Sequence, residues 1–363
     1  MKKLIFPFIV MASLLLSVGC STKFNVAAPY KNITVVYAFL DRADTAHYIR
    51  IQKAFLDQNK SAISMAQTPD SNFYSSISVR IERYAFSGTG AWYDTIHLNR
   101  VDLGLEGYPK QSGTFFNAPN YAYKFTNTLD PNYIYRIKIT NLVTGAVDSS
   151  DAPVLDDVSS AFKVDVIDDS NLNRAGMDFS SSFQSKIFEF VATYYPVSNF
   201  SFEGFSSPAY VSQAYIRFNW TDSNELTKAK TQHSYDFNAG FLLFNNNNQA
   251  DYKVHNIDLY SAIASGMGVA PANTARLIDR CNISLYISTY DYYLYQQTTA
   301  NQGTGLTGSE IEPISTNIKG NDALGLYTSR GMHTGKLTIT RTTIDSLKTN
   351  PMTQPMNIVG TAY

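Results

Sequence analysis

Cysteine is almost absent from this sequence, which holds only two, Cys20 and Cys281, in 363 residues. Small secreted scaffolds are held together by several disulfides, so that class of protein is excluded. Charged residues are scarce as well, at 16% of the chain, where about 25% is typical of soluble domains. The 29 basic and 30 acidic residues nearly cancel, whereas nucleic-acid binding needs a basic face. We therefore expect no nucleic-acid partner.

Recognisable catalytic and metal-binding motifs are missing too. No two histidines are spaced i, i+2 for a strand or i, i+4 for a helix, so there is no local zinc signature. The histidines are His47, His97, His233, His255 and His333. An EF-hand loop, a glycine-rich phosphate loop and a Gly-x-Ser-x-Gly nucleophile elbow are also absent. The sequence predicts no catalytic residue, no metal and no cofactor.

The one long apolar run, at residues 4–16, follows two lysines and ends close to Cys20. It is too short to cross a bilayer, which takes about 20 apolar residues as a helix, but it fits the apolar region of a secretory signal. Residues 17–20, Ser-Val-Gly-Cys, resemble the lipobox of bacterial lipoproteins, although Ser17 stands where that pattern prefers Leu. The resemblance implies a signal peptide over 1–19, lipid chains such as palmitate on Cys20, and a tether over 20–31. Two or more such chains anchor a protein stably in a membrane.

An ordinary cleaved signal followed by an incidental cysteine is the alternative. If Cys20 is acylated, Cys281 has no partner for a disulfide. Cys281 opens the alternating run "CNISLYI", and we predict that it serves as a small buried hydrophobic residue.

What the chain does contain is aromatic residues, 25 Tyr and 22 Phe, arranged with the period of two that marks β-strands. Strands are predicted over 33–40, 47–52, 76–84 and 132–140, the first of them apolar on both faces and therefore central. A long loop with a helical turn at 62–66 interrupts this pattern. The predicted fold is all-β, with two antiparallel β-sandwich domains, Ig-like or jelly-roll-like, and a few short helices in the second.

An Asp- and Ser-rich stretch at 148–159 marks the predicted boundary between an N-terminal sandwich, 32–155, and a C-terminal β-rich domain, 160–345, followed by a tail, 346–363. In the second domain a helix over 256–268 is expected, capped by Asp258 and ended by glycine. A second short helix is expected over 271–280. Further strands are predicted over 162–167, 186–195, 209–220, 238–245 and 282–289.

The segment 282–330 resembles the C-terminal part of a Bacteroidota lipoprotein family, the domain-of-unknown-function 4249 family. The matching pieces are a strand that runs into a Tyr-rich helix, 283–295, then Asn301-Gln302, Asn317-Ile318-Lys319-Gly320 and Ala323-Leu324-Gly325. The resemblance, to this family or a sister family, implies a two-part β-sandwich lipoprotein of the outer membrane that often accompanies a TonB-dependent transporter. It implies no catalytic residues.

We therefore expect a lipid-anchored protein of the outer membrane, on either face, that acts as a non-catalytic binding or accessory module. Its candidate partners are the membrane through Cys20, a transporter or other envelope protein, and a glycan. Trp92 and Trp220 are the candidate ligand-binding aromatics, because flat rings stack on sugar faces; alternatively, the rings fill the core. A structural or adhesion subunit of the cell envelope is the second hypothesis. A cryptic carbohydrate-active hydrolase comes last, since its paired carboxylates would be spaced in three dimensions rather than in sequence.

Overall fold

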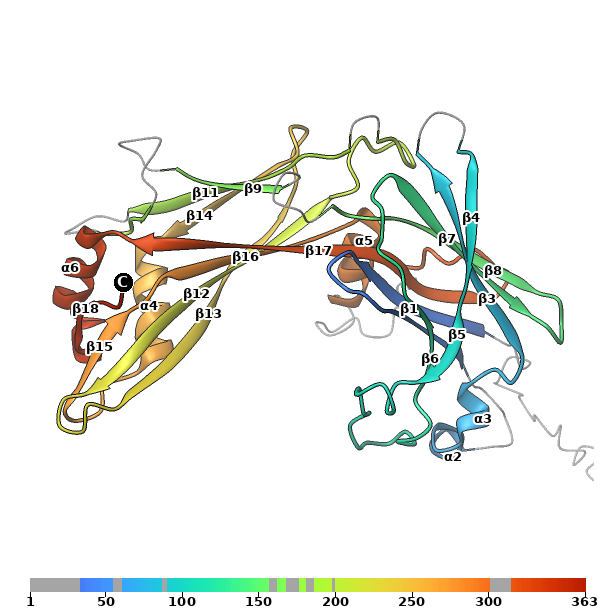
Figure 1. Cartoon of the computed structure of the whole chain (residues 1–363), viewed down its shortest axis with the longest axis horizontal. Coiled ribbons are helices and arrows are strands. Elements are labelled where there is room, and N and C mark those ends of the chain that lie inside the picture. Colours follow the sequence, from blue (N-terminus) through green and yellow to red (C-terminus); the bar gives the residue numbers. More distant parts are fainter. Residues whose placement is uncertain are drawn as a thin grey trace, which may run out of the picture.

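The protein, seen here as a computed structural model, is built mostly of strands that form three sheets in two lobes (Figure 1). The all-β prediction is confirmed. The structure describes residues 33–54, 61–86, 90–156, 162–167, 176–180, 186–197, 200–300 and 315–363. Cys20 lies outside the described residues.

The first lobe holds the N-terminal strands. They are β1 (Ile33–Asp41), β2 (His47–Ala54), β3 (Ile77–Ala85), β4 (Trp92–His97), β5 (Asn99–Asp102), β6 (Tyr121–Phe125), β7 (Tyr133–Asn141) and β8 (Val147–Pro153), with the short helices α2 (Ala62–Ala66) and α3 (Pro69–Asn72). Every strand expected before residue 150 is present, and so is the helical turn at 62–66. In β7, Tyr135, Ile137 and Ile139 are buried, as the period of two requires.

The remaining elements lie mostly in the second lobe. They are β9 (Phe162–Ile167), β10 (Gly176–Met177), β11 (Ile187–Tyr194), β12 (Val211–Asn224), β13 (Lys230–Leu243), β14 (Gln249–His255), α4 (Asn256–Met267), β15 (Thr274–Ile278), β16 (Cys281–Ser288), α5 (Tyr290–Ala300), β17 (Ala323–Ile339), α6 (Arg341–Thr349), the 3-10 helix η2 (Gln354–Met356) and β18 (Ile358–Thr361).

One strand, β17, belongs to both lobes. Its first residues pair in parallel with β1, from Ala323 beside Thr34 to Arg330 beside Asp41. From Arg330 onward it pairs antiparallel with β16, as far as Leu337. The largest sheet therefore runs through the whole molecule in the order β18-β15-β12-β16-β17-β1-β2-β6-β5, with β17 spanning the two lobes in Figure 1.

The sheets are not purely antiparallel, which corrects that part of the prediction. β17 pairs in parallel with β1 and β10, and β15 pairs in parallel with β18. Period-two alternation is the same in both kinds of strand, so it could not reveal the direction of pairing.

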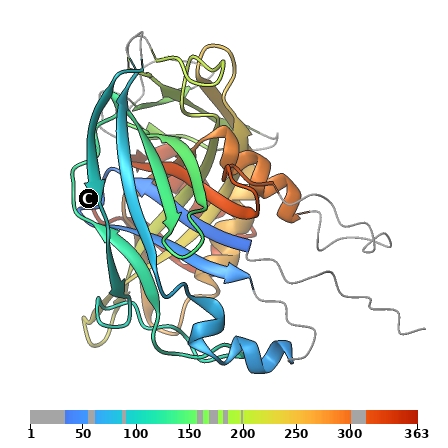
Figure 2. The same cartoon turned by 90° about the vertical axis from the view of Figure 1, so that its right-hand side faces the viewer.

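Two separate clusters of buried side chains form the cores. The first joins the large sheet to the four-stranded sheet β4-β3-β7-β8 and draws on residues 36–154, together with Ile318, Ala323 and Tyr327. Figure 2 shows these two sheets face to face. The second draws on residues 155–358. The first core ends at Val154 and the second begins at Leu155, within the boundary predicted at 148–159. Ile318, Ala323 and Tyr327, which the sequence assigned to the C-terminal domain, belong to the first core.

The C-terminal residues are part of the second core. Leu347, Met356 and Ile358 are buried there, and β18 extends the large sheet beside β15. Residues 346–363 are therefore an integral element and not the tail that the sequence suggested. Their apolar positions belong to a short helix and a four-residue strand, which carry too little periodicity to be recognised alone.

The helix expected over 271–280 is instead the strand β15, which pairs with both β12 and β18. Asn273 has a left-handed φ of 56°, which a continuing α-helix does not accommodate. The helix α4 is where the sequence placed it, with Leu259, Ala262 and Ile263 buried and Gly268 at its end. Its N-cap is His255 rather than Asp258.

Asn317 opens the motif Asn317-Ile318-Lys319-Gly320 that was singled out from the sequence. Its side chain holds β17 in place. Its side chain accepts a hydrogen bond from the Tyr327 backbone nitrogen at 3.0 Å and donates to the Tyr327 carbonyl at 2.7 Å. It also donates to Asp291 of α5 at 2.9 Å. The next residues continue the four-stranded sheet, since Ser149 and Lys319 exchange backbone hydrogen bonds at 2.6 and 2.8 Å.

We predict that Gly325→Ala destabilises the protein by about 3 kcal/mol, because overpacking is combined with a strained backbone. Gly325 has a φ of +122°, and a Cβ there would lie 1.9 Å from the Val36 carbonyl oxygen. Urea unfolding followed by circular dichroism measures the change.

Gly335→Ala is the matched control on the same strand, because no atom lies within 4 Å of its Cβ position. It should change the free energy of unfolding by less than about 1 kcal/mol. If both substitutions lowered the free energy of unfolding equally, the close approach of β1 to β17 at Gly325 would not be what makes Gly325→Ala destabilising.

Candidate functional site

The large sheet has one face turned toward the two cores and one face turned away from them. On β16, Ile283, Leu285 and Ile287 are buried in the second core, so Ser284 and Tyr286 point to the opposite side. On β1, Val36 and Ala38 lie in the first core, so Phe39 shares the face of Tyr286. We call this continuous surface the open face of the sheet.

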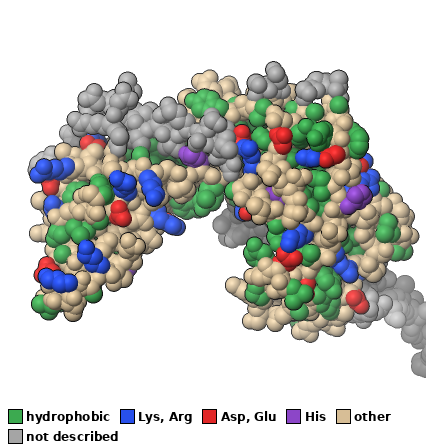
Figure 3. Space-filling model, in the orientation of Figure 1, with side chains coloured by type: hydrophobic (Ala, Val, Ile, Leu, Met, Phe, Trp, Pro, Cys, Tyr) green, Lys and Arg blue, Asp and Glu red, His purple; other side chains and the backbone are tan. Residues whose placement is uncertain are grey.

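A cavity of about 470 Å³ lies on the open face where the two lobes meet. Ligand pockets have volumes of roughly 300 to 1,000 Å³. The residues that define this junction groove come from five strands, and they are Phe39, Tyr215, Arg217, Asp236, Tyr286 and Arg330. Tyr292 of α5 forms one wall. The surface between the lobes is hollowed in Figure 3.

The aromatic rings of the junction groove are held at fixed angles by one another. The Tyr215 and Tyr286 rings meet edge to face with centroids 5.8 Å apart, and those of Phe39 and Tyr292 do so at 5.6 Å. Tyr286 is nevertheless 45% exposed. An oriented ring with a free face is what a stacking contact requires.

Each arginine of the junction groove is paired with a carboxylate. Arg217 donates two hydrogen bonds to Asp236, at 2.6 and 2.7 Å, and these lower the pKa of Asp236. Arg330 donates to Asp41 at 2.9 Å and lies over the Phe39 ring. The two pairs leave the groove with polar groups but without net charge.

A neutral ligand that is polar at its edges and apolar on its faces suits these residues. Gln213 adds an amide, whose nitrogen donates to the Tyr215 hydroxyl at 2.9 Å. Exposed rings beside amides and paired arginines can stack on C–H faces and bond to hydroxyl groups, as carbohydrates require.

The Tyr-rich helix α5 has two roles. Tyr290 and Tyr293 pack against Tyr210, with ring centroids 4.8 and 5.4 Å away. Tyr292 lies one step around the helix and turns to the junction groove. Burial raises the pKa of Tyr292, which keeps its hydroxyl protonated and able to donate.

The two tryptophans singled out from the sequence lie apart from the junction groove. Trp92 is 61% exposed on β4 of the four-stranded sheet. Trp220 is only 5% exposed and stacks on His233 with centroids 5.4 Å apart. Trp220 is therefore mainly a core residue and not an open platform, because it shares the inward face of β12 with Ile216 and Phe218.

Trp220 also touches a second cavity, of about 440 Å³. This cavity opens where β12 changes partner from β16 to β15, and Asn219, Asn282 and Lys336 make it polar. The indole nitrogen of Trp220 is buried and has no hydrogen-bond partner among the described residues.

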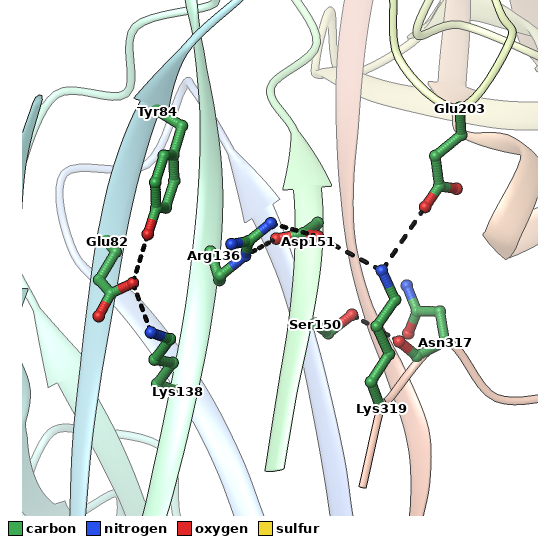
Figure 4. Close-up of polar contacts among 9 residues, drawn as sticks. All are labelled: Glu82, Tyr84, Arg136, Lys138, Ser150, Asp151, Glu203, Asn317 and Lys319. Atoms are coloured by element: carbon green, nitrogen blue, oxygen red, sulfur yellow. Dashed lines mark hydrogen bonds and ion pairs between the residues drawn. The ribbon is translucent and has the colours of Figure 1, made fainter. Parts of the chain in front are cut away.

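The outer face of the four-stranded sheet carries a second polar surface, drawn in Figure 4. Arg136 bonds to Asp151 through two nitrogens, at 2.5 and 3.1 Å, and lies over the Tyr84 ring at 4.7 Å. Lys319 reaches Asp151 at 3.5 Å and Glu203 at 3.8 Å. This network ties the segment before β17 to the first lobe.

The remaining sequence expectations concern Cys281, metal ligands and membrane-spanning helices. Cys281 is fully buried and free, as predicted, and burial raises the pKa of its thiol. Across the described ranges, no three His, Cys, Asp or Glu side chains are grouped to hold a metal ion. None of the helices within those ranges has the length and apolar character to cross a membrane.

Comparisons with known proteins add no family. No protein-family model matches the chain, and no curated protein is significantly similar to it. Membership of the domain-of-unknown-function 4249 family therefore stays a prediction.

The groove residues could have been anticipated in part. In "AYVSQAYIRFNW" the buried alternates are Ala214, Ile216 and Phe218, which leaves Tyr215 and Arg217 on the other face. Nothing in the sequence brings these residues beside Phe39 and Arg330, because that requires the pairing of β17.

We predict that Glu82→Gln costs about 2 kcal/mol of stability near neutral pH and progressively less in acid. Burial raises the pKa of Glu82, but hydrogen bonds from Tyr84, Lys138 and Arg80 outweigh it and lower that pKa to about 2. The carboxylate is thus favoured in the folded state, so its contribution is full above its ordinary pKa of 4.5. That contribution is lost as the pH falls toward about 2. Urea unfolding at several pH values measures it.

Glu203→Gln serves as the control, since Glu203 is half exposed and lies 3.8 Å from Lys319. It should cost no more than about 0.5 kcal/mol at any pH. A pH-independent cost for Glu82→Gln would contradict the lowered pKa.

Proposed function

We propose that this protein is a lipid-anchored, non-catalytic binding module of the outer membrane whose junction groove takes a carbohydrate. The observation that carries the ligand class is the charge-balanced, aromatic lining of the groove: Tyr286 is half exposed, and Arg217 is bonded to Asp236. A free sugar face can stack on the ring. The arginine and carboxylate still have hydrogen-bonding capacity for hydroxyl groups.

Binding is favoured over hydrolysis by the distribution of carboxylates. Asp236 is the one carboxylate among the described residues that line the junction groove, and both its oxygens accept from Arg217. Glycoside hydrolysis uses two carboxyl groups, one of them with a raised pKa. The pKa of Asp236 is lowered instead.

The anchor and the location rest on the sequence around Cys20, and the association with a TonB-dependent transporter rests on the family resemblance. In this arrangement the protein holds a ligand close to the transporter that imports it.

A structural or adhesion subunit is the second candidate, favoured by the outer face of the four-stranded sheet. Trp92 is exposed there, opposite Tyr84 in the strand register, and Arg136 covers Tyr84. Aromatic residues and arginine are enriched at protein interfaces. This surface would bind protein without involving the junction groove.

To test the ligand site, Tyr286→Ala and Arg217→Ala are screened on a glycan array, in the chain from residue 20 onward with Cys20→Ser. Each should weaken binding about tenfold, the equivalent of one stacking or charge-assisted contact. Trp92→Ala is the matched control and should bind normally. Loss of binding with Trp92→Ala alone would move the site to the outer face of the four-stranded sheet.

The anchor has its own test, metabolic labelling of cells with a radioactive fatty acid. The native chain should carry the label and partition with the outer membrane, and Cys20→Ser should lose both. Label that persists in the Cys20→Ser variant would refute the proposed anchor.

A further inference from the structure

Four large apolar side chains are exposed at one end of the first lobe. Leu105 is 91% exposed, Ile63 60%, Tyr108 59% and Phe115 45%. Ile63 belongs to α2, and the other three belong to the loop between β5 and β6. We call these four residues the base patch. Figures 1 and 2 show α2 and this loop together at the same end of the lobe.

The base patch is held as one surface. The Phe116 backbone nitrogen donates to the Ala66 carbonyl at 3.3 Å, which joins the loop to α2. Beneath it, the Phe73 ring packs against Phe116 and Tyr121 with centroids 5.7 and 5.3 Å apart. The exposed side chains are therefore supported by a packed layer, which reduces the conformational entropy lost on binding.

The base patch lies at the end of the lobe where the chain enters the fold. Ile33, the first residue of β1, pairs with Ala54 at the end of β2, and α2 is the next element in the sequence. The β5–β6 loop leaves at the same end, because Asp102 pairs with Tyr121 and β6 runs beside β2.

The distance from Cys20 to the base patch is limited by the chain itself. Only 13 peptide units separate Cys20 from Ile33, so a fully extended chain reaches at most about 45 Å. A lipid on Cys20 keeps this end of the first lobe close to the bilayer, and exposed apolar side chains are then within reach of the lipid headgroups.

We infer that the base patch inserts into the headgroup region of the bilayer and is a second membrane contact, beside the lipid on Cys20; the inference rests on the proposed anchor. The occupant is lipid, because the tether brings a membrane to this surface. Lys110 lies over the Phe115 and Phe116 rings, at 5.0 and 4.9 Å, and a cation beside apolar side chains suits an anionic interface. The contact orients the protein, since the acyl chains alone allow it to rotate.

The test measures co-sedimentation with vesicles of phosphatidylethanolamine and phosphatidylglycerol, using the chain from residue 20 onward with Cys20→Ser, which carries no lipid. This protein should partition onto the vesicles, and Leu105→Asp should reduce the partition coefficient at least about tenfold. Ile63→Ser, on α2 instead of the loop, should reduce it too, so a local disturbance of the loop cannot explain both results.

Leu226→Asp is the matched control. Leu226 is 74% exposed between β12 and β13 on the other lobe, and its replacement should leave partitioning unchanged. No vesicle binding by the parent, or an equal loss with Leu226→Asp, would overturn the inference. Intact vesicle binding by Leu105→Asp would do the same, and would leave a protein as the occupant of the patch. The fatty-acid labelling of Cys20 is independent of this assay, so the anchor and the base patch can fail separately.

Discussion

The pairing of β17 with two different strands is the constraint on which the molecule depends. Between Ala323 and Arg330 the strand completes the first sandwich beside β1, and from Arg330 to Leu337 it lies beside β16. Gly325 allows β1 to come close, because any side chain there would meet the Val36 backbone. The two cores are thus joined by continuous backbone hydrogen bonds along one shared strand.

The junction groove is a direct consequence of that shared strand. Because both cores lie against the same face of the large sheet, the opposite face is uncovered where one lobe passes into the other. Arg330 stands at the change of partner and links Asp41 of β1 with the groove. The polar and aromatic side chains on the outward faces of several strands meet there and form one concave surface.

The strand β1 also relates the groove to the membrane in our proposals. Ile33 lies at the end that carries the base patch, and Phe39 lines the junction groove. Six residue steps along the strand separate them, or about 20 Å. A lipid-anchored protein resting on the base patch would hold its ligand about that far above the bilayer, while the outer face of the four-stranded sheet remains available to a protein.

The period of apolar residues determined much of the local structure: strands such as β7, the helix α4 and the burial of Cys281. The Asp- and Ser-rich stretch at 148–159 located the division between the two cores. Periodicity states which residues share a face, and it does not state which strands pair. Asp41 and Arg330 meet across 289 positions, so only the tertiary structure decided the parallel β1–β17 pair, the strand β15 and the junction groove. It also placed Trp220 inside the second core, because a ring on an alternating strand faces either core or solvent according to the layer that covers it.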